Sequence, residues 1–113
     1  MDSILTSVKK MCGITEEYEV FDMDIITHIN SVFMILTQLG VGPAEGFSIE
    51  DKYSLWVEFI PESAKLQAVK SYMYFKVRLM FDPPQSSSDI ARIEKMITEL
   101  EWRLNIAVGP ELS

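Results

Sequence analysis

The side chains best suited to nucleophilic chemistry are Cys12 and His28, the only cysteine and the only histidine of the chain. A cysteine nucleophile reacts as a thiolate and needs a base such as histidine beside it. No flanking motif supports such a pair, and Cys12 falls on the apolar stripe of a predicted helix. A single cysteine also excludes an intrachain disulfide and a cysteine-based zinc cluster. We therefore interpret Cys12 as a small core residue and His28 as a partly buried or exposed side chain rather than a metal ligand.

The remaining candidates for chemistry have simpler explanations. Asp22 and Asp24 are two residues apart, so they do not face each other on a helix. At the start of a helix they serve as a cap and as a complement to the helix dipole. The segment Gly40-Val41-Gly42 lacks the lysine and the serine or threonine of a phosphate-binding loop, and it follows a helix rather than a strand. We predict no catalytic residue, no metal site and no cofactor, and a protein that is not an enzyme.

The charge balance of the chain disfavours binding to nucleic acid. Its 113 residues include 17 acidic and 10 basic ones, for a formal net charge of −7. Affinity for phosphate normally depends on a positive surface, yet the basic residues are scattered apart from Lys9 and Lys10. None of the predicted helices has the basic face of a helix-turn-helix reader. An acidic surface can still face DNA without adhering to it, because like charge repels phosphate.

Targeting signals are absent from the pattern of the sequence. No apolar run approaches the roughly 18 to 20 residues that span a bilayer. Residues 1–10, MDSILTSVKK, lack the basic start and the long apolar core of a signal peptide. We expect a protein without membrane contact, located in the cytoplasm or wherever an assembly carries it.

The longest helical pattern, residues 61–81, must position everything else. Pro61 suits a first helical position because its fixed φ is helical, and Pro83 disfavours the α conformation at Asp82, so we expect the helix to end near Phe81. One apolar face comprises Leu66, Val69, Met73, Val77 and Met80, and a second comprises Ala68, Tyr72, Phe75 and Leu79. A helix that is apolar over more than half its circumference packs from two sides. We predict that this is the central helix.

The turn after the central helix, Asp82, Pro83 and Pro84, is predicted to be structural. The two prolines cannot continue the helix, and the Asp82 carboxylate could accept free backbone N–H groups at the start of the following turn. We assign these three residues a role in shaping the connection and none in chemistry.

The other elements follow from caps and stops. A short first helix is capped by Asp2 or Ser3 and ended by Gly13, a second is capped by Asp22 and ended by Gly40, and a last one starts within residues 86–89 and ends at Gly109 and Pro110. A single helical turn is expected at 55–59. The predicted fold is all-α: a small bundle of four main helices around the central helix. It forms one domain over residues 1–113, with 109–113 as a flexible tail.

Two places are candidates for contact with a partner. The long loop at 40–53 could hold a short strand or extended arm at Phe47-Ser48-Ile49, and loops this long in small domains are often functional. Phe47 and Ile49 either bind a partner or plug the core. The last helix has a narrow seam of Ile90, Ile93, Ile97, Leu100 and Leu104, and Trp102 points away from it. Trp102 is either an interface anchor or packs on a connector or the loop.

The order of these elements resembles the small head–tail connector proteins of tailed bacteriophages and prophages, also called head-completion or adaptor proteins. The residues that carry the resemblance are Asp22-x-Asp24-Ile25-Ile26-x-x-Ile29-Asn30, Trp56-x-x-Phe59 after a Gly-rich loop, and Ala68-x-x-x-Tyr72-x-x-x-Lys76-x-Arg78 closing on Phe81-Asp82-Pro83-Pro84. They lie between a short N-terminal helix and a final amphipathic helix. The resemblance covers about residues 2–107.

The resemblance implies a structural virion protein without catalytic activity. Such proteins form a homo-oligomeric ring, dodecameric when assembled, beneath the portal of the filled head. The ring joins the portal to the next neck or tail-completion protein, and DNA passes through its channel without specific binding. The implied location is the head–tail junction of the virion, after synthesis in the bacterial host cytoplasm.

Carried over to this chain, the resemblance gives a set of candidate interface residues. The portal-facing segment would contain Trp102, Arg103, Ile106, Val108 and Leu112, and the loop with Phe47 and Ile49 would serve neighbouring subunits or the next ring. The alternative function is a small acidic adaptor or regulator that acts by protein–protein binding. A connector should form rings, alone or on a portal, whereas a regulator should form a small stoichiometric complex.

Overall fold

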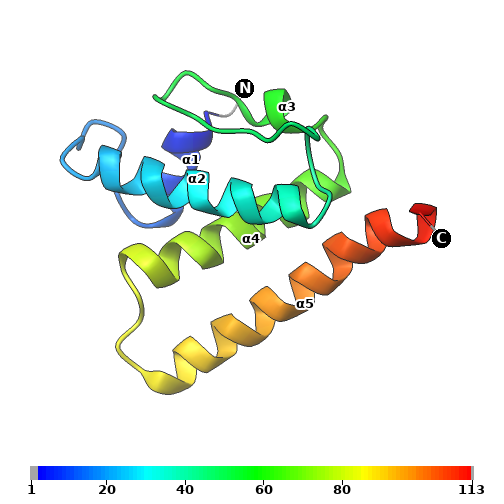
Figure 1. The fold of residues 1–113 in the computed structure, drawn as a ribbon. Helices are drawn as coiled ribbons and strands as arrows, with labels where there is room; N and C mark the ends of the chain where they lie inside the picture. Colours follow the sequence, from blue (N-terminus) through cyan, green and yellow to red (C-terminus); the bar gives the residue numbers. More distant parts are fainter. Residues whose placement is uncertain (1–2, 113) are drawn as a thin grey trace.

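The computed structural model describes the backbone of residues 3–112 and the side chains of residues 3–105. Over that range the chain is all-α, as predicted, and forms five helices without a strand. They are α1 (Ile4–Met11), α2 (Asp22–Gln38), α3 (Trp56–Phe59), α4 (Ala64–Phe81) and α5 (Ser87–Leu112). Figure 1 shows α1, α2 and α3 on one side of α4 and α5 on the other. Because α4 contacts α1, α2 and α5, the prediction of a central helix is confirmed.

The first two helices end at glycine, in the same way. After α1, Gly13 has a φ of 81°, and the N–H groups of Gly13 and Ile14 donate to the carbonyls of Lys10 and Lys9. This pair of bonds is a Schellman motif, which needs a residue that tolerates positive φ. The same pattern follows α2 at Gly40, whose φ is 82°. Both predicted stops are confirmed.

The central helix begins later than the sequence predicts. We expected its first residue at Pro61, but α4 starts at Ala64. Ser63 is the N-cap, in extended conformation, and its hydroxyl oxygen accepts a hydrogen bond from the Leu66 N–H. The serine side chain satisfies a free N–H of the first turn. A helix that began at Pro61 would have Ile60 as its cap, and isoleucine has no side-chain acceptor. The predicted end at Phe81 is confirmed.

The two apolar faces of α4 pack against different neighbours. Leu66, Val69, Met73 and Val77 are buried in the core that α1 and α2 share, and Tyr72 is fully buried although its hydroxyl reaches α5. That hydroxyl lies 2.7 Å from Oε2 of Glu101, to which it donates. The bond gives a buried phenol the partner it requires and fixes the position of α5 along α4.

The Tyr72 phenol is expected to ionise only at high pH. Burial, followed by the hydrogen bond to the Glu101 carboxylate and by its charge, raises the pKa of Tyr72 well above its ordinary value. Because the folded-state pKa is raised, the stabilisation is complete below the unfolded pKa of about 10 and is lost as the pH rises through the folded pKa. In a titration followed by phenolate absorbance, Tyr72→Phe should show a smaller absorbance change at high pH than the unmodified protein. An equal change in the two proteins would contradict the raised pKa of Tyr72.

The long loop between α2 and α3 is tied down by one side chain of α2. The Asn30 amide donates to the Ile49 carbonyl at 3.0 Å, and its oxygen accepts from the Ile49 N–H at 2.8 Å. Because Asn30 satisfies both backbone groups of Ile49, this part of the loop needs no neighbouring strand. The short strand that we considered at Phe47-Ser48-Ile49 is therefore wrong: no strand is assigned to these three residues.

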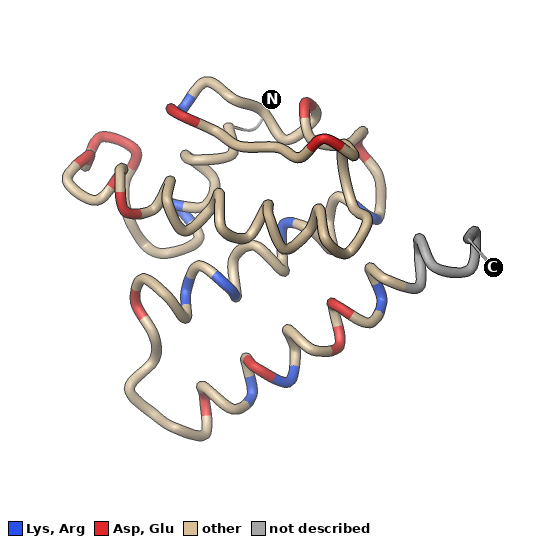
Figure 2. Tube along the Cα trace, viewed as in Figure 1, with Lys and Arg blue, Asp and Glu red and all other residues tan. Residues whose placement is uncertain are grey.

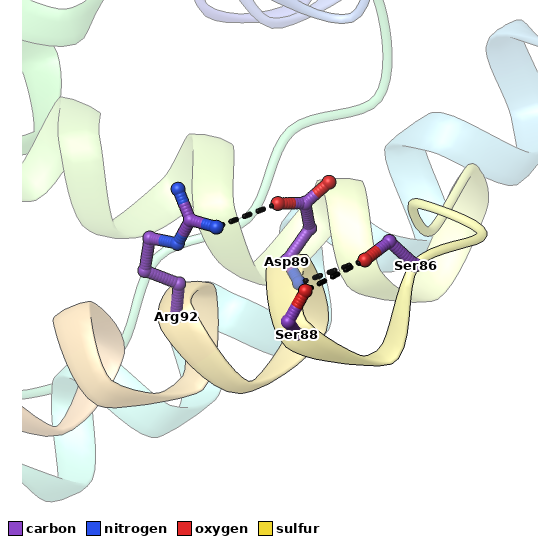
Figure 3. Close-up of polar contacts among 4 residues, drawn as sticks. All are labelled: Ser86, Ser88, Asp89 and Arg92. Carbon is purple, nitrogen blue, oxygen red and sulfur yellow. Dashed lines mark hydrogen bonds and ion pairs between the residues drawn. The ribbon is translucent and has the colours of Figure 1, made fainter.

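The start of α5 is fixed by a small polar network, shown in Figure 3. The Ser86 hydroxyl oxygen accepts from the Asp89 N–H at 3.4 Å and lies 2.9 Å from the Ser88 hydroxyl. One turn on, Arg92 pairs with Asp89 at 3.0 Å. Ser86 thus serves as the cap that the serine run predicted. All four side chains are exposed, so the network contributes little beyond defining the first turn.

The turn before α5 is closed through Asp82 by contacts other than the one predicted. The Arg78 Nε donates to the Asp82 carbonyl oxygen at 2.6 Å, and the Asp82 N–H donates to the Arg78 carbonyl at 3.0 Å. Both bonds use the Asp82 backbone, whereas we had assigned the bonding role to its carboxylate. The last turn of α4 is thereby closed by its own arginine.

The far end of α5 also differs from expectation. The helix continues through Gly109 and Pro110 to Leu112, so the predicted stop at Gly109 is wrong. Pro110 lacks the N–H that a helix interior uses and its ring crowds the preceding turn, so the last turn of α5 continues at a cost of roughly 3 kcal/mol. The side chains of 106–113 lie outside the described residues, and the flexible tail at 109–113 stays a prediction.

Candidate interaction surfaces

The groups that could perform chemistry are not arranged to do so within the described residues. Burial raises the pKa of the Cys12 thiol, an effect opposed by Arg78 and reinforced by Asp82. A raised pKa keeps the thiol protonated near neutral pH, which is the inert state of a cysteine. No group of three or more His, Cys, Asp or Glu side chains lies where it could hold a metal ion, as far as the structure describes the chain. The surfaces of the molecule are therefore the place to look for function.

The first candidate surface is the outer face of α5. Ile97 and Leu104 of the seam are buried against α4, and Trp102 is 66% exposed. Lys95 and Arg103 are exposed as well. The prediction that Trp102 points away from the seam is confirmed, and its alternative, packing on a connector or the loop, is wrong. An exposed indole is the side chain most enriched in the energetic centre of protein interfaces.

Three of the predicted portal-facing residues cannot be placed. The side chains of Ile106, Val108 and Leu112 lie outside the part of the chain that the structure describes. Their backbone continues α5, so Leu112 is ten residues beyond Trp102 on the same helix. The interface role of these residues stays a prediction.

Of the two alternatives for Phe47 and Ile49, the structure favours packing in the core. Ile49 is only 2% exposed. The Phe47 ring lies with its centroid 5.0 Å from that of Phe33 and 5.4 Å from that of Phe59, in edge-on contacts. Such contacts hold aromatic rings in a core. Ile49 is therefore not available as a surface anchor in the single subunit. Phe47 is half-buried, and its ring fastens the loop to α2 and α3.

A surface that the sequence analysis missed lies at the connection between α1 and α2. Tyr18, Val20, Phe21 and Met23 are all exposed, Val20 at 70% and Met23 at 76%. They alternate with the acidic residues Glu17, Glu19, Asp22 and Asp24. We call residues 15–24 the acidic knob; it is the loop at the left of Figure 1 and carries the densest acidic colouring of Figure 2. The sequence signal for this surface is the alternation of apolar and acidic residues.

The acidic knob is held by a buried lysine. Lys9 is 2% exposed, and its Nζ donates to the Glu16 carbonyl at 2.9 Å and lies 2.8 Å from Oδ1 of Asp22. These two contacts bind both ends of the knob to α1. Asp22 is the first residue of α2, with Phe21 as the cap residue, so the predicted capping role of Asp22 is wrong. The Asp22 carboxylate pairs with Lys9 instead of accepting a hydrogen bond from a backbone N–H of the first turn.

The knob is also supported from below by aromatic contacts. The Phe21 ring stacks edge-on against Phe81 at 5.2 Å between centroids, and Tyr18 lies 5.7 Å from Phe21. Phe21 therefore connects the knob to the end of α4. These contacts hold the acidic knob in a defined conformation.

None of the helices in the described range combines the length and apolar character that crossing a membrane requires. A comparison with protein families matches residues 4–111 to the family described as Phage connector protein. No curated protein and no solved structure matches the chain. The matched range runs from the first residue of α1 into the last turn of α5, so it includes the acidic knob, the long loop and Trp102.

Proposed function

Because the chain belongs to the phage connector protein family, it is a structural protein of the phage neck, and we propose that it forms a ring joining the portal of the filled head to the tail components. The ring is dodecameric when assembled and leaves a central channel for DNA. Its location is the head–tail junction of the virion, after synthesis in the bacterial host cytoplasm. The family is a structural one and not a class of enzymes.

The observation that carries this proposal is the extent of the family match, which covers residues 4–111 and therefore nearly the whole chain. Two surface features support it. The outer face of α5 presents Trp102 to solvent. A portal-binding segment from Trp102 to Leu112 needs such an exposed side chain. The acidic residues on the rim of the long loop, Glu45, Glu50 and Asp51, are exposed and suit a channel wall that repels DNA phosphate.

The partners in this proposal are other copies of the chain, the portal protein and the next protein of the neck. The long loop serves neighbouring subunits or the next ring through its exposed residues, since Phe47 and Ile49 are occupied in the core. DNA passes without specific binding, because the exposed rim of that loop is acidic.

The test is negative-stain electron microscopy of the purified protein, alone and mixed with the portal from the same genomic neighbourhood. Rings with a central channel in either sample, or added density on the portal, support the proposal. Small particles with no added density on the portal overturn it and favour the alternative, an acidic adaptor or regulator that binds one protein stoichiometrically.

Replacement of the exposed indole should separate folding from assembly. Trp102→Ala should leave the circular dichroism spectrum and the thermal midpoint unchanged, because the side chain is largely exposed. Binding to the portal should weaken by roughly thirtyfold, the size of an interface hot spot. Tyr53→Ala is the matched control, since Tyr53 is an exposed aromatic residue outside α5. Loss of folding in Trp102→Ala, or equal binding by both variants, would sink the interface role of Trp102.

A further inference from the structure

Besides the seam that packs on α4, helix α5 has a second regular row of side chains. Asp89, Arg92, Met96, Glu99 and Arg103 recur at spacings of three and four residues, so they share one face of the helix. All five are exposed, Met96 at 44%. We call these five residues the α5 stripe. It follows the helix for about 21 Å, at 1.5 Å per residue.

The charges of the α5 stripe are arranged symmetrically about Met96 in position and oppositely in sign. The acidic Asp89 lies seven residues before Met96, and the basic Arg103 lies seven residues after it. The basic Arg92 precedes Met96 by four residues, and the acidic Glu99 follows it by three. Figure 2 shows acidic and basic segments interspersed along α5, in contrast with the acidic knob. When a second copy of the stripe is laid antiparallel over the first, each charge therefore faces an opposite charge.

We propose that two copies of the free subunit pair antiparallel through their α5 stripes, about a two-fold axis at Met96. Asp89 of each copy faces Arg103 of the other, and Arg92 faces Glu99, so the contact contains four ion pairs. The two Met96 side chains meet at the axis. The same patch serves on both copies, which is the definition of an isologous contact.

The charges disfavour the other ways of pairing two α5 helices. In a parallel pair without a shift, each charge of the stripe would face its own copy, and like charges at an interface cost binding free energy. In a parallel pair shifted by one turn, Asp89 faces Arg92 and Glu99 faces Arg103, but Met96 falls opposite a charged residue. The antiparallel pair matches all four charges and leaves Met96 against an apolar neighbour.

Met96 gives this contact an apolar centre. It lines a groove between α4 and α5 together with Phe75 and Leu100, which are half-buried. Glu99 and Arg103 line the same groove. In the antiparallel pair, the part of the other copy that lies over the groove runs from Asp89 to Met96. The pair therefore covers apolar side chains that are partly exposed in the single subunit.

The ion pair within the α5 stripe is compatible with this contact. Arg92 Nη2 lies 3.0 Å from Oδ1 of Asp89, as Figure 3 shows, and the two side chains are 71% and 52% exposed. An exposed pair of this kind contributes less than about 1 kcal/mol. A guanidinium has several N–H donors and a carboxylate has two oxygens, so each group can bind a second partner.

The geometry limits the size and the strength of the pair. A two-fold contact is closed, so it stops at two subunits and does not extend into a ring. One face of one helix buries less than the roughly 1,200–2,000 Å² of a stable interface, so the pair is weak and reversible. On the basis of the proposed function, we interpret it as a form of the subunit before assembly, in which the portal and a second copy compete for α5.

The first test is sedimentation velocity of the full chain at increasing concentration. The unmodified protein should show a monomer–dimer equilibrium that shifts toward monomer at high salt, because ions screen exposed charges. A protein that stays monomeric up to about 1 mM, where a binding free energy of about 4 kcal/mol would be detected, overturns the proposal.

Charge reversal tests which residues form the pair. Asp89→Lys with Glu99→Lys makes the charges of the stripe all basic, and Arg92→Glu with Arg103→Glu makes them all acidic. Each variant alone should raise the dissociation constant of the dimer at least about tenfold. An equimolar mixture of the two should recover the dimer, because opposite stripes then face each other. Failure of the mixture to dimerise, with both variants folded by circular dichroism, would overturn the antiparallel pair.

A matched control changes the same charges elsewhere. Glu50→Lys with Asp51→Lys, on the long loop, gives the same change of net charge as the basic stripe variant, and both positions are exposed. Its dimer should be as stable as that of the unmodified protein. An equal loss in this control would assign the effect to net charge and sink the role of the stripe.

Cross-linking tests the two-fold axis. In a Cys12→Ala background, Met96→Cys places a thiol next to its own copy, so a short bifunctional maleimide should give homodimers. Lys95→Cys is the matched control, since Lys95 is the neighbouring residue, exposed but outside the stripe. Equal yields from the two variants would contradict an axis at Met96.

The outcomes separate this inference from the proposed function. If the α5 pair is absent but electron microscopy shows rings or density on the portal, the proposed function stands and the pairing fails. If the pair forms but the portal sample shows no added density, the pairing stands and the proposed function fails.

Discussion

Phe33→Ala is expected to lower the free energy of unfolding by about 3–5 kcal/mol. Phe33 is fully buried, and its ring contacts three others: Phe47 at 5.0 Å, Trp56 at 6.3 Å and Phe59 at 4.7 Å between centroids. Truncation removes the buried ring and leaves a cavity that the surrounding aromatic residues cannot fill without moving. The loss is a large part of the roughly 5–15 kcal/mol by which domains of this kind are stable.

The effect should extend beyond α2, because the aromatic cluster joins three segments. Phe47 fastens the long loop, Phe59 belongs to α3, and the Trp56 indole donates to the Ser7 hydroxyl of α1 at 2.8 Å. The loop also packs on the cluster at Gly42. A Cβ at this position would lie 2.3 Å from the Phe59 ring, so the backbone can come this close to the ring only because residue 42 is glycine. Loss of Phe33 should therefore loosen the loop and the contact with α1 together.

Urea denaturation of Phe33→Ala and Met34→Ala gives the measurement. Met34 follows Phe33 on the same helix and is 65% exposed, so its truncation should change the free energy of unfolding by no more than about 0.5 kcal/mol. Equal losses in the two variants would show that the aromatic cluster is not the centre of the core.

Lys9→Met should lower the free energy of unfolding by about 1–3 kcal/mol. Methionine retains the apolar length of the lysine stem, so the loss reports the ammonium group. Without it, the Glu16 carbonyl and the Asp22 carboxylate lose the donor that both share. The Asp22 side chain remains partly exposed, and water can replace some of the lost interaction, which keeps the expected loss below that of a fully buried pair.

A double-mutant cycle isolates this pair. Lys9→Met with Asp22→Asn should be less destabilised than the sum of the two single variants, because the second change removes the charge that the first leaves uncompensated. Lys10→Met is the control, since Lys10 is the neighbouring exposed lysine. Strict additivity in the cycle would contradict an energetic role for the ion pair.

The same variant tests whether Lys9 orders the acidic knob. Lys9 holds both ends of the acidic knob, so Lys9→Met should also increase amide exchange at residues 15–21, where the turn bonds of Tyr18 and Asp22 close the loop.

Local sequence signals determined most of the helical framework. The stops at Gly13 and Gly40, the end of the central helix at Phe81 and the exposure of Trp102 follow from residues within one or two turns of each position. Helical periodicity likewise placed α4 at the centre, because two apolar faces on one helix require two neighbours. These features depend on spacing along the chain, which a sequence displays directly.

Only the tertiary structure decided which alternative each ambiguous residue takes. Lys9 lies in the last turn of α1, and it is buried because the fold brings Glu16 and Asp22 to its ammonium group. Phe47 and Ile49 suited a partner or the core equally well, and the positions of Phe33 and Asn30 assign them to the core. The acidic knob likewise depends on contacts between distant residues, with Lys9 and with Phe81. Such outcomes depend on residues distant along the chain, and periodicity carries no information about which distant groups meet.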